Sequence, residues 1–87
     1  MTYQIITPKA VQKQILALPV EIAARINEAI LVLEDNPRPD GVVKMKGGDH
    51  LYRIRVGDYR VIYKIDDEQL VILVVRCKHR RDVYRAK

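Results

Sequence analysis

The chain has 87 residues, of which 48% are hydrophobic and 31% are charged, and its formal net charge is +5. This length predicts a single domain with a modest core. The lone cysteine, Cys77, excludes an internal disulfide and gives no metal-ligand spacing. The longest apolar run, Leu70 to Val75, is too short to span a membrane, and the first residues lack the character of a signal peptide. We therefore expect one cytoplasmic domain over residues 1–87, without membrane association.

The positive charge is concentrated in the second half of the chain. Residues 1–43 contain four basic and five acidic residues, whereas residues 44–87 contain twelve basic and six acidic ones. The net charges of the two halves are therefore −1 and +6. A basic half of this kind favours docking of a phosphate-rich or acidic partner.

Two helices are predicted near the N-terminus. After a short β-type run at Tyr3–Ile6, Thr7 and Pro8 form a helix start signal, and the first helix covers about residues 8–17. A second helix follows Pro19 and ends before the proline-rich segment that starts at Asn36. Its apolar stripe consists of Ile22, Ile26, Ala29, Ile30 and Leu33. This helical pair needs a sheet on which to bury its apolar residues.

Four strands are predicted for that sheet, over residues 41–46, 51–56, 59–63 and 69–76. Gly57-Asp58 lies between two alternating runs, which indicates a two-residue hairpin loop. Such a loop places Arg55 opposite Arg60, with Arg53 on the same face. The last strand is apolar on both faces and is predicted to be central. The fold class is therefore α+β, with two N-terminal helices packed on one face of a mostly antiparallel four-stranded sheet, and a short C-terminal helix or tail.

The opposed arginines of the hairpin are candidates for an anion-binding site. Like charges directly opposite each other destabilise a hairpin, so Arg55 and Arg60 break a local rule, as functional residues often do. The alternative is that they only keep an exposed face soluble. Further polar groups follow the last strand, and we expect them to converge with the arginines at one corner of the sheet. They are Lys78, His79, Arg80 and Tyr84.

These residue types suit the cleavage of a phosphodiester. Arginine binds phosphate oxygens with two parallel hydrogen bonds, and histidine exchanges protons near neutral pH. Each has a simpler interpretation: His79 as an exposed residue of a basic tail, and Tyr84 as an anchor for that tail. Lys44 and Lys46 are either a solvated strand face or an extension of a phosphate-binding surface.

Two blocks of the sequence together resemble a known family. They are Leu-Tyr-Arg-Ile-Arg-Val-Gly-Asp-Tyr-Arg-Val-Ile-Tyr over residues 51–63 and His-Arg-Arg-Asp-Val-Tyr-Arg over residues 79–85. The chain, over essentially its whole length, resembles the RelE branch of the RelE/ParE toxins of bacterial toxin–antitoxin systems. The resemblance implies an endoribonuclease that enters the ribosomal A site, cuts mRNA there by 2′-OH attack and inhibits translation. It implies no metal and no cofactor, and a RelB-like antitoxin as partner.

The resemblance also assigns roles to residues. Arg60 matches an arginine that steadies the scissile phosphate, and Tyr84 matches a tyrosine that orients the substrate. The basic acid/base position falls at Lys78, His79 or Arg80, depending on alignment. We favour His79 as the general acid and Arg80 as a phosphate ligand. The expected RNA contacts are Lys44, Lys46, Arg53, Arg55, Lys78 and Arg81.

Arg55 departs from the pattern, because well-studied members often have lysine there and arginine is a poor general base. Either His79 then covers more than one role, or charge stabilisation carries most of the rate. Two functions of other classes are alternatives to mRNA cleavage. One is a non-enzymatic poison of DNA gyrase, as in the ParE branch. The other is an RNA-binding protein that blocks translation without cleavage.

Overall fold

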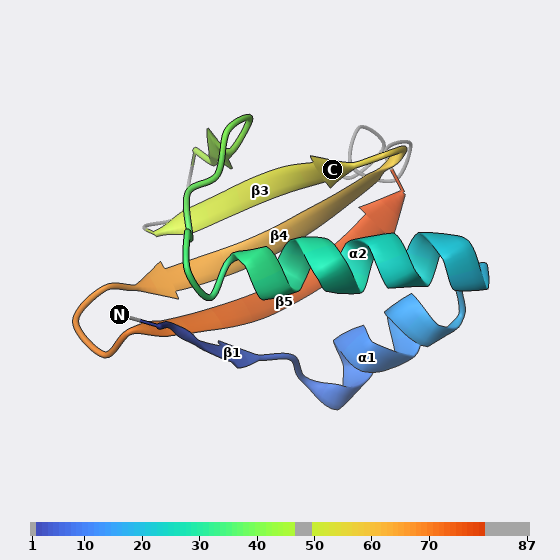
Figure 1. Ribbon diagram of the computed structural model, residues 1–87, viewed down its shortest axis with the longest axis horizontal. Helices are drawn as coiled ribbons and strands as arrows, with labels where there is room; N and C mark the ends of the chain where they lie inside the picture. Colours follow the sequence, from blue (N-terminus) through green and yellow to red (C-terminus); the bar gives the residue numbers. More distant parts are fainter. Residues whose placement is uncertain (1, 47–49, 80–87) are drawn as a thin grey trace.

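The computed structural model describes residues 2–46 and 50–79. Its elements are β1 (Gln4–Ile6), α1 (Lys9–Leu16), α2 (Val20–Val32), β2 (Val43–Lys44), β3 (Leu51–Val56), β4 (Tyr59–Asp66) and β5 (Val71–His79). The strands form one sheet in the order β1-β5-β4-β3-β2, and both helices lie on the same side of it (Figure 1). The α+β class and the two helices on one face are confirmed. The predicted C-terminal helix or tail lies outside the described residues.

The sheet has five strands rather than the predicted four, because β1 joins it. β1 pairs in parallel with β5, with Ile5 opposite Ile72, whereas the other pairings are antiparallel. The sequence indicated the β-type run at Tyr3–Ile6, but no local pattern shows that its partner is β5, far along the chain. At the other edge, β2 contains only Val43 and Lys44, so the strand predicted over residues 41–46 is shorter than expected.

Both helices begin directly after a proline. Pro8 and Pro19 have extended backbone conformations, with ψ of 154° and 143°, and each occupies the N-cap position. Their carbonyl oxygens accept hydrogen bonds from the backbone N–H groups of Gln12 and Ala23. The proline ring fixes φ near the value that a helix start requires, and no N–H is lost to the helix. The first helix therefore starts one residue later than predicted.

The core lies between the helices and the sheet face that they cover. Its buried side chains from the helical segment are Val11, Ile15, Ile26, Ile30 and Leu33. Those from the sheet are Tyr52, Ile54, Val61, Tyr63, Ile65, Ile72, Val74 and Cys77. Full burial of one large apolar side chain contributes about 1.5–3 kcal/mol, so this interface supplies most of the stabilisation. The opposite sheet face, which carries Arg53, Arg55 and Arg60, is here called the arginine face.

An irregularity in β5 decides which residues reach the arginine face. Ile62 pairs with Arg76 but Tyr63 pairs with Val74, so Val75 is an extra residue in β5. A single extra residue moves every side chain beyond it to the other face. The start of β5 also differs from the prediction, because Leu70 has a positive φ of 56° and belongs to the preceding turn.

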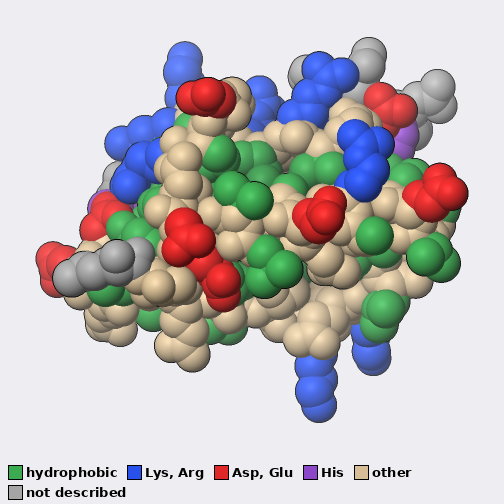
Figure 2. All heavy atoms as spheres, in the orientation of Figure 1, with side chains coloured by type: hydrophobic (Ala, Val, Ile, Leu, Met, Phe, Trp, Pro, Cys, Tyr) green, Lys and Arg blue, Asp and Glu red, His purple; other side chains and the backbone are tan. Residues whose placement is uncertain are grey.

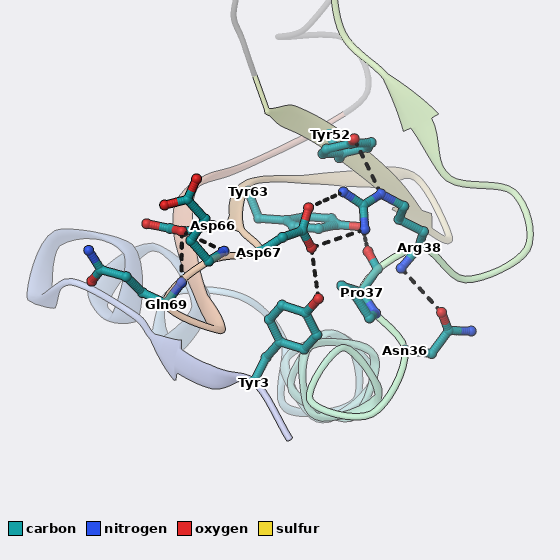
Figure 3. A network of polar contacts seen from close by, with 10 residues as sticks. Tyr3, Asn36, Pro37, Arg38, Tyr52, Tyr63, Asp66, Asp67 and Gln69 are labelled. Atoms are coloured by element: carbon teal, nitrogen blue, oxygen red, sulfur yellow. Dashed lines mark hydrogen bonds and ion pairs between the residues drawn. The ribbon is translucent and has the colours of Figure 1, made fainter. Parts of the chain in front are cut away.

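A polar network closes the sheet at the end away from the Gly57 hairpin (Figure 3). Arg38, in the segment after α2, forms an ion pair with Asp67 at 2.9 Å, and the Tyr3 hydroxyl donates to the same carboxylate at 2.7 Å. The hydrogen bonds from Arg38 hold the pKa of Asp67 below its usual value. The network thereby connects the residue before β1, the segment after α2 and the β4–β5 turn.

Two stacked tyrosines continue this network into the core. The Arg38 guanidinium lies 5.0 Å from the centre of the Tyr52 ring, which stacks on Tyr63 with 6.1 Å between ring centres. The Tyr63 hydroxyl donates to the Pro37 carbonyl oxygen at 2.7 Å, and burial raises the pKa of Tyr63 to about 12. Tyr63 therefore anchors the segment after α2 to the centre of the sheet.

Candidate functional site

A row of three basic residues crosses the arginine face close to the Gly57 hairpin. Arg55 on β3 lies opposite Arg60 on β4, and Arg60 lies opposite Lys78 on β5. Cross-strand partners share a face, and neighbouring strands are about 4.8 Å apart, so these cations project side by side. The predicted opposition of Arg55 and Arg60 is confirmed. The row Arg55–Arg60–Lys78 is called the cationic row below.

Arg60 is the unusual member of the cationic row. It is only 9% exposed, and its Nη1 atom is buried without a hydrogen-bond partner within the described part of the chain. A buried donor left unpaired costs about 1–3 kcal/mol. A guanidinium held between two further cations destabilises the protein unless an anion accepts its hydrogen bonds. The arrangement is suited to binding a phosphate.

Arg55 is held away from Arg60 by the hairpin turn. Its Nε donates a hydrogen bond to the Gly57 carbonyl oxygen at 3.0 Å. Gly57 has a φ of 60°, a left-handed conformation that glycine adopts at no steric cost. The turn therefore draws the Arg55 guanidinium towards the end of the hairpin, which lessens the repulsion across the strand pair.

The structure does not place His79 with Arg60. His79 lies opposite Tyr59, on the sheet face that the helices cover, and its ring meets the Tyr59 ring edge-on with 5.1 Å between centres. Alternation counted from the start of the last strand would have put His79 on the arginine face. The extra residue Val75 reverses that alternation, so Lys78 rather than His79 lies beside Arg60.

Two predicted RNA contacts on the edge strand also differ in position. Lys44 lies opposite Tyr52, on the helix side of the sheet and not with the arginines. Lys46 is exposed and follows β2. Arg53 is on the arginine face, opposite Ile62 as predicted. The remaining predicted site residues, Arg80, Arg81 and Tyr84, lie outside the described residues.

Sequence reasoning missed two basic residues of the arginine face. Arg76 lies opposite Ile62, and Lys64 lies opposite Leu51 on one side and Leu73 on the other. Arg76 and Lys78 alternate with the buried Cys77, which is a signal that both charged residues point away from the core. This alternation is out of phase with Ile72 and Val74, and it could have revealed the extra residue in β5.

The helix side of the described structure has a different distribution of charged side chains. On the helix side, acidic side chains lie among apolar ones, while most basic side chains project from the rim (Figure 2). Within residues 2–46 and 50–79, no group of three or more His, Cys, Asp or Glu side chains could hold a metal ion. No helix in these ranges is long and apolar enough to cross a membrane.

Comparison with known proteins places the chain in a family. Residues 5–84 match the family described as the ParE toxin of the type II toxin–antitoxin system parDE. A chain in the crystal structure of the archaeal RelE–RelB complex from Pyrococcus horikoshii is 38% identical, with 92% of this chain and 97% of that chain covered and a TM-score of 0.82. This chain is a RelE-type toxin of the RelE/ParE superfamily.

Two further RelE toxins are similar to this RelE-type toxin. The RelE1 toxin of Methanocaldococcus jannaschii is 28% identical over 98% of both chains. The isolated Escherichia coli RelE toxin is 22% identical, with 94% of this chain and 90% of that chain covered and a TM-score of 0.77, which shows a common fold. The toxin therefore belongs to a type II toxin–antitoxin system.

Proposed function

We propose that this RelE-type toxin is an endoribonuclease that cuts mRNA in the ribosomal A site and thereby inhibits translation. One observation carries the proposal: the buried Arg60 guanidinium, whose Nη1 atom has no hydrogen-bond partner among the described residues, lies between Arg55 and Lys78 in register across three strands. A protein that only packs against a partner has no need of a buried guanidinium nitrogen without a hydrogen-bond partner. An enzyme that stabilises charge on a phosphate does, because preorganised donors act most strongly where water is excluded.

The proposed reaction is an internal transfer within the RNA. The 2′-oxygen of one nucleotide forms a bond to the adjacent phosphorus, and the bond from phosphorus to the 5′-oxygen of the next nucleotide breaks. The 2′-hydroxyl loses a proton and the departing 5′-oxygen gains one, so the products are a 2′,3′-cyclic phosphate and a 5′-hydroxyl. Arg60 binds the phosphate oxygens on which negative charge increases. No external water or cofactor enters this balance.

Lys78 replaces His79 as the proposed general acid. A lysine ammonium carries protons to give, and the register places Lys78 directly beside Arg60 on the same face. His79 lies on the other side of the sheet, against Tyr59. Tyr84 stays the proposed residue that orients the substrate, and Arg80 the proposed second phosphate ligand. Arg81, Lys46 and Arg53 stay the proposed RNA contacts.

The proposed partners follow from the same site and from the relatives. The basic arginine face suits ribosomal RNA as well as mRNA, and action on ribosomes places the toxin in the cytoplasm. A RelB-like antitoxin is the proposed inhibitor, because the similar Pyrococcus horikoshii chain was crystallised in a RelE–RelB complex.

Primer extension on mRNA recovered from translating ribosomes tests the proposal. Purified toxin should produce cuts in phase with codons, and naked mRNA should remain largely uncut. The family match to ParE supports a second candidate, a DNA gyrase poison. Gyrase-dependent DNA breaks without codon-phased mRNA cuts would replace the first function with the second. Translation arrest without cuts would instead indicate a non-cleaving RNA binder.

A further inference from the structure

A second pair of arginines flanks the end of the β3–β4 hairpin, on the side that faces α2. Arg25 of α2 lies against the turn: a Cβ at Gly57 would be 3.7 Å from the Arg25 Nη1 atom. Arg55 reaches the same turn from β3, through its hydrogen bond to the Gly57 carbonyl oxygen. Within the described residues, neither side chain forms an ion pair, although Glu28 and Asp58 are nearby in the same hollows.

The two arginines line two adjoining hollows. One has a volume of about 540 Å³ and the other of about 240 Å³. Both are lined by Arg25, Arg55, Val56 and Gly57, and the smaller one also by Ile22 and Tyr59. Charged side chains therefore line these hollows together with the apolar and aromatic side chains of Ile22, Val56 and Tyr59, which are called the floor below. The four shared residues are called the hairpin saddle below.

Arg55 connects the hairpin saddle to the cationic row. It is the cross-strand neighbour of Arg60, and it also lines both hollows on the α2 side. Basic residues therefore continue from Lys78 through Arg60 and Arg55 and around the hairpin end to Arg25. Proteins that hold single-stranded RNA combine a charged track for the backbone with apolar or aromatic surfaces for the bases.

We propose that the hairpin saddle binds the phosphate of a nucleotide next to the cleaved one, so that the RNA strand bends around the hairpin end. Arg25 and Arg55 hold this second phosphate, and the floor of Val56, Ile22 and Tyr59 takes the base. Arg25 is then an RNA-binding residue outside the reaction centre. This inference rests on the proposed function, because the saddle is useful only if RNA occupies the cationic row.

The test measures binding of a single-stranded RNA oligonucleotide with 2′-O-methyl groups, which cannot be cleaved, by fluorescence anisotropy at several salt concentrations. Loss of one phosphate contact should make the fall of log K, where K is the association constant, with log salt concentration shallower by about 0.7. It should also lower the affinity at 0.1 M salt by about fivefold. Arg25→Ala should show both changes, and Arg25→Lys should recover the slope. Lys13→Ala removes a charge from the exposed surface of α1 and should change neither.

The outcomes separate this inference from the proposed function. If Arg60→Met lowers affinity and slope but Arg25→Ala does not, the saddle inference is overturned and the proposed function stands. If neither variant differs from wild type, or if wild type does not bind the free RNA, the saddle inference is overturned, and the proposed function is then decided by primer extension on mRNA from translating ribosomes. If Arg25→Ala leaves RNA binding intact but weakens the complex with the antitoxin, the saddle is a protein-docking surface and the inference is overturned.

Discussion

Replacement of Arg60 by methionine should stabilise the toxin while it abolishes cleavage. Methionine can follow the path of the arginine stem, and it removes the buried charge and the unpaired Nη1 donor. Replacing buried charged groups with apolar ones is neutral or stabilising by about 1–4 kcal/mol in other proteins. Two unit charges 5 Å apart repel by about 3 kcal/mol at an effective dielectric constant of 20. Arg55 is drawn away towards Gly57, so we expect a net gain of about 1–3 kcal/mol.

Thermal and urea denaturation measure this gain directly. For a domain of this size, each kcal/mol raises Tm by about 4–8 °C. Inorganic phosphate should stabilise the wild type but not Arg60→Met; at ten times its Kd the gain is about 1.4 kcal/mol. A variant that is less stable than wild type by more than about 1 kcal/mol would refute the reasoning, because Arg60 would then have a stabilising partner in the native protein.

Further predictions concern three residues of the scaffold, Tyr63, Asp67 and Cys77. Tyr63→Phe should lower the free energy of unfolding by about 0.5–1.5 kcal/mol in urea denaturation, because the Pro37 carbonyl loses its donor; an unchanged midpoint would contradict this. The folded pKa of Tyr63 is raised to about 12, so wild-type stability should fall as pH rises from 10 to 12, and Tyr63→Phe should lose less. The pKa of Asp67 is lowered, so its contribution to the free energy of unfolding is present above the unfolded pKa and is lost as pH falls through the folded pKa. Asp67→Asn should therefore make the loss of stability at acid pH less steep. A loss as steep as that of wild type would argue against the ion pair. Cys77 is buried and its thiol pKa is raised, so a thiol reagent should label it only at the rate of unfolding; rapid labelling of the folded protein would be inconsistent with this burial.

The sequence predicted the centre of the fold because local rules determine it. Gly57-Asp58 permits a two-residue loop, and that loop alone fixes which residues of β3 and β4 face each other. The stripe of Ile26, Ile30 and Leu33 likewise indicates the buried side of α2.

The prediction from the sequence differs from the structure where contacts between distant residues or a single extra residue determine the fold. The parallel pairing of β1 with the C-terminal strand β5 depends on contacts between distant parts of the chain. Three residues are too few to show such a pairing in a periodic pattern. Val75 interrupts the alternation of β5, so a count from Leu70 assigns His79 and Lys78 to the wrong faces. The side-chain path of Arg55 and the position of Arg25 depend on how α2 packs beside the hairpin, which no local pattern encodes.

The choice between Lys78 and His79 tests the central claim most directly. Single-turnover cleavage of ribosome-bound mRNA should be compared for Lys78→Met and His79→Gln, with Lys13→Ala as the control for a lost surface charge. General acid catalysis contributes about 10²–10⁴-fold, so Lys78→Met should lose roughly that factor and His79→Gln should stay within a few-fold of wild type. If His79→Gln loses the rate and Lys78→Met retains it, the cationic row Arg55–Arg60–Lys78 is not the reaction centre.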